Sequence, residues 1–275
     1  MNESTRSPVT GFITISALVF LFVPLGVVLL FSFHASGSLS FPFEGFSLRW
    51  YRDLMVNENF REAVANSMFI ATVTAAVTLV VGTLAAYGLS RSPVKLQPVL
   101  SLVFFLPLTL PGLFLGLSLL VMFAEVNISL SMVTVAAAHL IYVLPYFMLI
   151  AVGALQRLDP ALNEAAEDLG APPRTVFSKV ILPQVWPVIL GATFLAFALS
   201  FDEFIITFFV IGPDSTLPMF IWSSLRRTID PSINTISTVL LAATLLLFVI
   251  AFAFTVRAER QRRIRIDEAI GIGRL

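Results

Sequence analysis

The sequence predicts an all-α membrane protein with six transmembrane helices. Three observations support this fold class: the composition, six long apolar stretches, and the placement of charge between them. Hydrophobic residues make up 57% of the 275 residues and charged residues only 12%, with a mean hydropathy of +0.93. A typical soluble domain is about 25% charged, so this chain lacks the polar surface that a globule in water needs. The 26 Phe residues exclude a disordered chain.

Six apolar stretches are long enough to cross a bilayer, which takes about 20 helical residues at ~1.5 Å each. They are residues 12–33, 65–89, 98–123, 131–153, 186–211 and 236–256. A signal peptide is the alternative for the first stretch, since Ala35-Ser36-Gly37 follows it. The stretch is longer than the usual apolar core of a signal peptide, about 7–15 residues, so we expect an uncleaved helix.

Prolines lie inside several of these stretches, including the third and the fourth. Pro107 and Pro111 lie in the third, and Pro145 lies in the fourth. Membrane helices tolerate proline where neighbouring groups satisfy the freed carbonyls, and proline often kinks the helix. We therefore expect kinks in both stretches.

Every basic residue lies outside the six stretches, so the distribution of basic residues between the two sides of the membrane predicts the orientation. With the N-terminus in the cytoplasm, 12 of the 17 basic residues fall on the cytoplasmic side, as the positive-inside rule favours. This orientation gives a cytoplasmic segment at 1–11, a transmembrane domain at 12–256 with a cytoplasmic loop at 154–185, and a cytoplasmic tail at 257–275. We interpret the Arg cluster of the tail as a topological anchor, with contact to anionic lipid as the alternative.

The composition also excludes several chemistries. The chain has no Cys, so it has no disulfide framework and no thiolate metal site. Its two His lack metal-ligand spacing, and equal numbers of basic and acidic residues (17 each) indicate no nucleic-acid partner. No G-x-x-x-x-G-K-[ST] phosphate loop is present, so ATP hydrolysis is not expected on this chain. We expect no catalytic residue, metal or cofactor here.

The loop at 154–185 contains a short helix with strong end signals. Asp159 is suited to cap it, with Pro160 at its first position. Gly170 is suited to end it, and Pro172-Pro173 prevents its continuation. The sequence therefore predicts a helix over 160–169.

This short helix is amphipathic. One side carries Leu162, Ala165, Ala166 and Leu169, and the other carries Asn163, Glu164, Glu167 and Asp168. Such a helix between two spans suits a lever that transmits force to a soluble partner. The alternative is a helix lying flat on lipid, but such helices usually carry basic residues and bulky aromatics, and this one is acidic with small alanines.

A spaced pattern begins in this helix. It reads Glu164-Ala165-Ala166-Glu167-Asp168-Leu169-Gly170-Ala171, then Phe177, Ile181-Leu182-Pro183 and Pro187. This pattern resembles the EAA loop of ABC-importer permeases. Four further segments are Gly45-Phe46-Ser47-Leu48-Arg49-Trp50-Tyr51, Asn66-Ser67, Gly82-Thr83-Leu84-Ala85-Ala86-Tyr87 and Ser200-Phe201-Asp202-Glu203-Phe204. They look like the spermidine/putrescine-type branch, and most like the second permease of the pair.

The resemblance implies a type I ABC-importer permease fold (MetI-like) in the bacterial inner membrane, with both termini cytoplasmic. In that family the EAA loop contains the coupling helix that docks on the ATPase. The residues it assigns to ATPase coupling here are Leu162, Glu164, Ala165, Ala166, Asp168, Leu169 and Gly170. The expected partners are a dimeric ATPase carrying ATP and Mg, a second permease, an extracytoplasmic solute-binding protein and membrane lipid.

Asp202 and Glu203 are the only acidic residues well inside a predicted span. Each costs about 2.5–3.5 kcal/mol at a helix centre on insertion scales, so such residues normally face a cavity or a partner. We expect one to line the solute path and the other to pack against a neighbour. The alternatives are a gate or interface element, or an ion pair to Arg226 or Arg227. Further path candidates are Ser200 and Tyr142, while His139 reads as a satisfied packing residue.

The expected function is ATP-driven import of a small solute by alternating access, with a polyamine such as spermidine or putrescine leading. An opine, an aminophosphonate, an amino-acid-like cation or ferric ion are the alternatives within the same architecture. A secondary transporter or channel is the alternative from another class, and it predicts inverted repeats that we do not see. An intramembrane enzyme would need a cluster such as His139 with Asp202 and Glu203.

Overall fold

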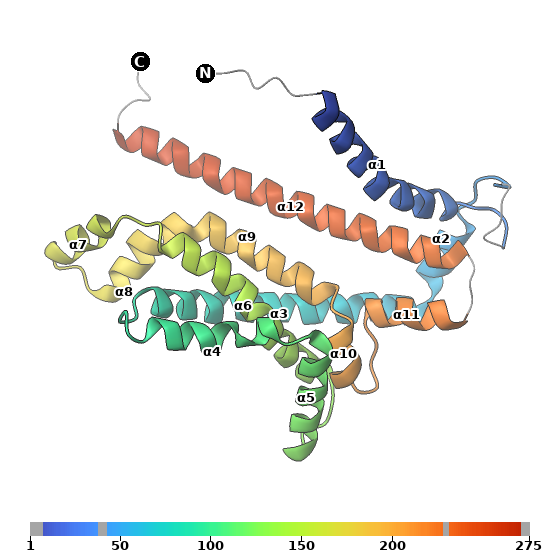
Figure 1. Ribbon diagram of the computed structural model, residues 1–275, viewed down its shortest axis with the longest axis horizontal. Helices are drawn as coiled ribbons and strands as arrows, with labels where there is room; N and C mark the ends of the chain where they lie inside the picture. Colours follow the sequence, from blue (N-terminus) through green and yellow to red (C-terminus); the bar gives the residue numbers. More distant parts are fainter. Residues whose placement is uncertain (1–7, 38–42, 228–230, 271–275) are drawn as a thin grey trace. The chain divides into compact units, whose positions relative to one another are not determined.

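The computed structural model describes residues 8–37, 43–227 and 231–270, and its regular structure over those ranges is helical (Figure 1). One isolated bridge pairs His34 with Phe46. The chain divides into two compact units, each of which is described by itself. Unit 1 comprises the chain up to Arg61 and Phe220–Ala243, and unit 2 comprises Glu62–Met219 and the chain from Thr244.

Four helical segments are long and apolar enough to cross a membrane. They are Thr10–Phe31 in α1 (Pro8–Phe31), α3 (Glu58–Ser90), α6 (Met132–Leu155), and the run Pro173–Phe201. That last run consists of α8 (Pro173–Thr175), the π-helix η1 (Val176–Ile181) and α9 (Leu182–Phe201). These segments contain most of the predicted first, second, fourth and fifth spans.

The predicted third span is not a single continuous helix, so that expectation is wrong. The chain forms α4 (Gln97–Thr109) and α5 (Gly112–Glu125), and their axes are bent by 102°. Leu110 between them is extended (φ −91°, ψ 125°), because a following proline disfavours the helical conformation. Pro111 then caps the new helix, so the bend falls at one of the two prolines flagged in this stretch.

The predicted fifth span, 186–211, is wrong at its end. Helix α9 stops at Phe201, and a separate short helix, α10 (Ile205–Val210), follows. In α12 (Pro231–Ile270) the apolar stretch among the described side chains, Pro231–Leu246, is shorter than a full span. The described residues thus give four spans, or five with the bent pair, and the count of six stays a prediction.

Two buried clusters hold unit 2 together, one toward each end of α6. The first joins α3, α5, α6 and α10, and includes Ile70, Leu119, Val135 and Ile206. The second joins α3, α6, η1 and α9, and includes Ala86, Phe147, Ile181 and Ile189. Figure 1 shows the consequence: α7 (Pro160–Asp168) and α8 lie at one end of α6 and α9, and α10 lies at the other.

Close approach of α3 and α6 depends on a glycine. A Cβ placed on Gly82 would lie 2.6 Å from Cδ1 and 2.9 Å from Cε1 of Phe147. Phe147 is almost fully buried, so its ring has little room to move away. The two helices can therefore pack at this distance only with glycine at position 82.

Side-chain hydrogen bonds organise unit 1 around the end of α1. The Ser32 hydroxyl lies 2.7 Å from that of Tyr51 in α2 (Arg49–Val56), and the Trp50 indole donates to the His34 carbonyl at 2.9 Å. The hydroxyl of Thr235 in α12 donates to the Ser32 carbonyl at 3.1 Å. Helix α11 (Leu217–Arg227) adds Phe220, whose ring packs edge-on against Phe60.

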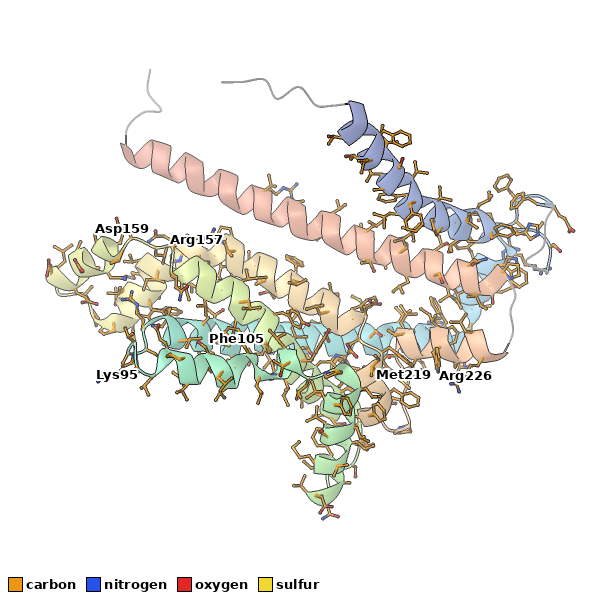
Figure 2. All side chains as sticks on the ribbon, viewed as in Figure 1. Lys95, Phe105, Arg157, Asp159, Met219 and Arg226 are labelled. Atoms are coloured by element: carbon orange, nitrogen blue, oxygen red, sulfur yellow. The ribbon has the colours of Figure 1, made fainter. Side chains whose placement is uncertain are left out.

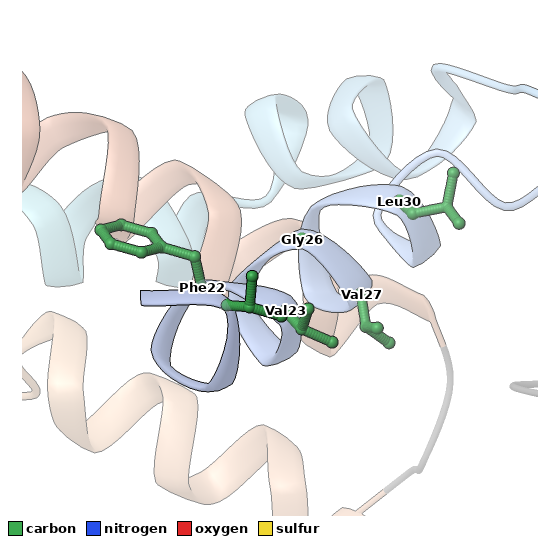
Figure 3. A pocket seen from close by; sticks show the side chains of 6 residues that line it. Phe22, Val23, Gly26, Val27 and Leu30 are labelled. Atoms are coloured by element: carbon green, nitrogen blue, oxygen red, sulfur yellow. The ribbon is translucent and has the colours of Figure 1, made fainter. Parts of the chain in front are cut away.

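The described side chains of α1 are almost all exposed, which suits a helix whose surroundings are lipid. A hollow of about 430 Å³ runs along this helix and is lined by its own residues (Figure 3). Phe22, Val23, Val27 and Leu30 surround it, and Gly26 leaves the space between them. Its lining is apolar, so it provides no group that would orient a polar solute.

Candidate functional site

Helix α7 forms where the sequence predicts it, and both ends are fixed by the expected residues. The Asp159 carboxylate accepts a hydrogen bond from the Ala161 amide at 3.0 Å, which caps the first turn. At the other end Gly170 adopts φ +77°. The Gly170 amide donates to the Glu167 carbonyl (2.8 Å), and the Ala171 amide donates to that of Ala166 (3.1 Å). This bond pair is a Schellman motif, with Leu169 as the last capping residue.

The two sides of α7 are not divided as the sequence suggested. Asn163, placed on the polar side, is only 8% exposed. Ala166, placed on the apolar side, is half-buried and packs against the cluster of α3, α6, η1 and α9. The division into an apolar side with Ala166 and a polar side with Asn163 therefore does not match the exposure of these two residues, because α7 packs against η1 and Ala166 lies against the cluster that η1 belongs to.

The remaining apolar residues of α7 form an exposed strip at i, i+3 and i+7, comprising Leu162, Ala165 and Leu169. Leu162 is 43% exposed and Leu169 is 89% exposed. Glu164, Glu167 and Asp168 are exposed beside the strip. An apolar strip with an acidic edge is suited to bind a protein groove.

The segment after α7 is anchored firmly to the spans. Val176 and Ile181 of the π-helix η1 are buried, and the ring of Phe177 lies 4.6 Å from that of Tyr87 in α3. Single π-helical turns occur often at functional positions, since they shift the register of the helix that follows. A displacement of α7 would therefore be passed to η1 and α9. Figure 2 labels Asp159 at the start of α7, with Arg157 just before it.

A second candidate site lies at the break between α9 and α10. Asp202 caps the end of α9, with its amide donating to the Ala198 carbonyl at 3.2 Å, and its side chain is exposed. Glu203 is half-buried, and its Oε1 accepts a hydrogen bond from the Ile206 amide at 2.9 Å. Glu203 therefore caps α10, while the carboxylate of Asp202 points away from the core.

His139 of α6 connects the two sides of this break. Its Nδ1 lies 2.8 Å from the Ser200 hydroxyl, and its Nε2 lies 2.8 Å from the Thr207 hydroxyl. Thr207 donates its own proton to the Glu203 carbonyl at 2.8 Å, so it accepts from Nε2–H, and Nδ1 accepts from Ser200. The prediction of a satisfied histidine is confirmed. Thr207 was missed, because one hydroxyl in an apolar run gives no periodic signal.

Tyr142 completes the group, since it lies one helical turn after His139 on α6. Its half-buried ring packs edge-on against Tyr146 with centroids 5.5 Å apart. Tyr142 also packs against the buried cluster that α10 shares with α3, α5 and α6. The structure thus brings all four predicted path candidates, Ser200 included, to one end of α6 and α9. An exposed carboxylate and a half-buried phenol are suited to bind a cation.

The same geometry does not suit catalysis. Both nitrogens of His139 are occupied by hydroxyls on neighbouring helices, so the ring has no free nitrogen to act as a base. No cluster of three or more His, Cys, Asp or Glu that could hold a metal is found among the described residues. The two acidic residues at the break have a capping role and an exposed position instead.

Comparison with known families decides the class of protein. The family described as binding-protein-dependent transport system inner membrane component matches residues 78–264, which include α7 and the helix break. The chain belongs to this family. It is therefore a multi-pass membrane protein and a transport subunit, and not an enzyme in its own right.

Members of the transport-component family with known names are similar over almost the whole chain. The putrescine transport system permease PotI of Escherichia coli K12 is 34% identical over 265 residues, covering 94% of each chain. The spermidine/putrescine permease PotC of the same strain is 30% identical over 240 residues, covering 87% of this chain and 90% of its own. The predicted membership of the spermidine/putrescine-type branch is confirmed.

Solved structures of ABC transporters agree on the fold. A bacterial ABC transporter that imports alginate superposes with a TM-score of 0.73 at 13% identity, covering 89% of this chain and 92% of its own. The inward-facing MetNI methionine ABC transporter gives 0.63 at 17% identity, covering 71% and 94%. The all-α type I permease fold is confirmed, and the chain is a permease subunit of an ABC importer. The secondary transporter and channel alternatives are set aside.

Proposed function

We propose that this permease uses α7 as the coupling helix, which docks on a separate dimeric ATPase and carries its movement to the membrane helices. One observation carries the proposal: α7 exposes Leu162, Ala165 and Leu169 on the side away from its own core. Water does not favour such a strip on a helix that is otherwise capped and packed, so a protein groove is its expected partner. The exposed Glu164 and Asp168 provide the polar rim that such contacts have.

The mechanism is alternating access. Closing of the ATPase dimer upon ATP binding draws α7 with it, and η1 passes the movement to α9. ATP and Mg bind on the ATPase, and this chain contributes no catalytic group. A ligand-driven change of this kind requires that the ATPase bind the two permease states with different affinity. The exposed strip of α7 is the surface that provides this difference.

We propose a polyamine of the putrescine or spermidine class as the solute. The names of the similar permeases PotI and PotC support this class. The exposed carboxylate of Asp202 supports it independently, because a carboxylate attracts a cation. An opine, an aminophosphonate, an amino-acid-like cation or ferric ion remain the alternatives.

The proposed assembly contains this permease, a second and different permease, the dimeric ATPase and an extracytoplasmic solute-binding protein. Both termini lie in the cytoplasm in this arrangement. The positive-inside rule supports that topology. The loop at 212–217, on the opposite end of unit 2 from α7, is held by hydrogen bonds from Asn66 to the Ser215 carbonyl and from the Leu217 amide to Ser67. We place it on the side of the binding protein.

Uptake into vesicles tests this function. The four components are reconstituted, and labelled putrescine is supplied with the binding protein outside. Uptake is expected with ATP in the lumen, and it is expected to stop when ATP is removed while a proton gradient is kept. Competition by unlabelled spermidine, an opine and ferric ion then ranks the solute classes. Uptake driven by the proton gradient alone would contradict the proposal.

A further inference from the structure

A polar pocket lies between the ends of α3, α6 and α7, on the inner side of α7. Its volume is about 250 Å³. The residues that line it are Tyr87, Ser90, Arg91, Leu155, Gln156, Leu158, Pro160, Asn163 and Ile181. Leu162, Ala165 and Leu169 do not line it, so this pocket is separate from the surface proposed for the ATPase.

One buried acceptor in the wall of the pocket has no hydrogen-bond donor. Asn163 is 8% exposed, and its Oδ1 is fully buried without any hydrogen-bond partner. A buried acceptor left unpaired costs about 1–3 kcal/mol, so a donor is expected there in the working protein. The Ser90 hydroxyl already donates its proton to the Tyr87 carbonyl at 2.8 Å, so its oxygen is a second acceptor in the same wall.

The outer side of the pocket carries a positively charged hydrogen-bond donor instead of acceptors. Arg91 is exposed at the rim, with its guanidinium 5.7 Å from the centre of the Tyr87 ring. A guanidinium at a rim is suited to bind a phosphate group. The pocket therefore offers a cation for a phosphate at its mouth and two acceptors for an amine inside.

The pocket also lies at the level where two apolar helices of membrane-spanning length end. The apolar helices α3 and α6 stop at Ser90 and Leu155, and both residues line the pocket. Lipid headgroups lie at this level, and basic pockets between membrane helices bind them. Leu155, Leu158 and Ile181 provide an apolar side for the glycerol end of a lipid.

We propose that this pocket binds the phosphoethanolamine headgroup of a bilayer phospholipid. The ammonium donates to Asn163 Oδ1 and to Ser90 Oγ, and the phosphate pairs with Arg91. An ammonium with free N–H groups is required, since a trimethylated nitrogen has no proton to donate. The site therefore discriminates phosphatidylethanolamine from phosphatidylcholine.

The test compares these two lipids on the purified complex in detergent. An equimolar mixture with identical acyl chains is added, free lipid is removed by size exclusion, and retained lipid is counted by mass spectrometry. The wild type is expected to retain about tenfold more phosphatidylethanolamine, the ratio given by one charge-assisted hydrogen bond. Equal retention of both lipids would overturn the proposal.

Variants assign the effect to the pocket. Asn163→Leu removes the acceptor and is expected to abolish the preference, whereas Asn163→Asp keeps an acceptor and is expected to retain it. Arg91→Gln is expected to lower retention of both lipids. Lys95→Gln, an exposed residue outside the pocket lining (Figure 2), is expected to behave as the wild type.

Two results would contradict the assignment of the lipid preference to this pocket. The first is a preference that survives in Asn163→Leu. The second is full displacement of the lipid by soluble phosphoethanolamine at the lipid's own concentration, because the acyl chains would then contribute nothing and the ligand would be a soluble one.

Discussion

His139 holds the two ends of a broken helix with one side chain. Its ring accepts from Ser200 on one side and donates to Thr207 on the other, and Thr207 in turn donates to the Glu203 carbonyl. The break at Asp202 and Glu203 is therefore fixed from α6. This gives the buried histidine a positioning role that its place in an apolar helix does not reveal.

We predict that His139→Leu destabilises the protein by about 2–4 kcal/mol, because in a buried place the Ser200 hydroxyl loses its acceptor and the Thr207 hydroxyl loses the donor from which it accepts. His139→Gln keeps one donor and one acceptor and is expected to recover part of this loss. Thermal unfolding in detergent measures the stability. Uptake kinetics test whether His139 positions the break at Asp202 and Glu203. His139→Leu is expected to change the KM for solute. An unchanged KM together with unchanged stability would contradict this positioning role.

The two acidic residues at the break are expected to differ in role. Asp202 is exposed and free to meet a solute, while Glu203 caps α10. Asp202→Asn is predicted to raise the KM for putrescine about fivefold, with little change in stability. Glu203→Gln keeps the capping oxygen, whereas Glu203→Leu loses the cap and about 0.5–2 kcal/mol of stability. An Asp202→Asn variant with wild-type KM would remove Asp202 from the solute path.

At the scale of the element, the packing of α3 on α6 depends on Gly82. Gly82→Ala is predicted to destabilise by about 1–3 kcal/mol, because its Cβ would lie 2.6 Å from the buried ring of Phe147. Gly88→Ala in the same helix is the matched control, since nothing lies within 4 Å of a Cβ there. Equal melting temperatures for the two variants would show that the helices separate easily at this point.

The end of α7 depends on the left-handed backbone of Gly170, and no neighbouring atom limits the size of a side chain there. Gly170→Asn is expected to retain uptake, because asparagine tolerates this conformation. Gly170→Val is expected to cost about 1–2 kcal/mol locally and to lower ATP-driven uptake. Comparison of uptake at equal expression tests this, and equal uptake in both variants would mean that the Schellman motif is dispensable.

Some elements could be predicted from the sequence because the signals were local. Asp159, Pro160 and Gly170 mark both ends of α7, and the structure uses each as expected. The break after Phe201 could not be predicted in the same way. Phe201 and Phe204 flank it without a glycine or proline, and its two sides are held by hydrogen bonds to His139 of another helix. The proline-marked third stretch gave the place of a bend but not its size of 102°.

Part of the candidate site could also be predicted, because some of its residues give a local signal in the sequence. The acidic pair stands out in an apolar stretch, so Asp202 and Glu203 were found directly. The inward side of α7 depends on how η1 packs, which composition does not encode, so Asn163 was misplaced. Arg91 and Asn163 meet only because the ends of α3 and α7 are adjacent in the fold.

At the scale of the whole molecule, the chain is a transport subunit, and we propose that ATP hydrolysis takes place on a partner. The described helices give a membrane scaffold, a polar break with an exposed carboxylate, and a capped helix that exposes an apolar strip. Membership of the binding-protein-dependent transport family agrees with this division. The central claim is that the exposed strip of α7 connects ATP hydrolysis to transport.

Co-purification of the ATPase with strip variants tests that claim most directly. Leu169→Asp places a charge on a residue that is 89% exposed, so folding should be unaffected while docking is lost. Val94→Asp, at an apolar residue that is 82% exposed in another predicted cytoplasmic loop, is the matched control. We predict that Leu169→Asp loses the ATPase and ATP-driven uptake while Val94→Asp keeps both. A Leu169→Asp permease that retains the ATPase and transports at the wild-type rate would contradict the account.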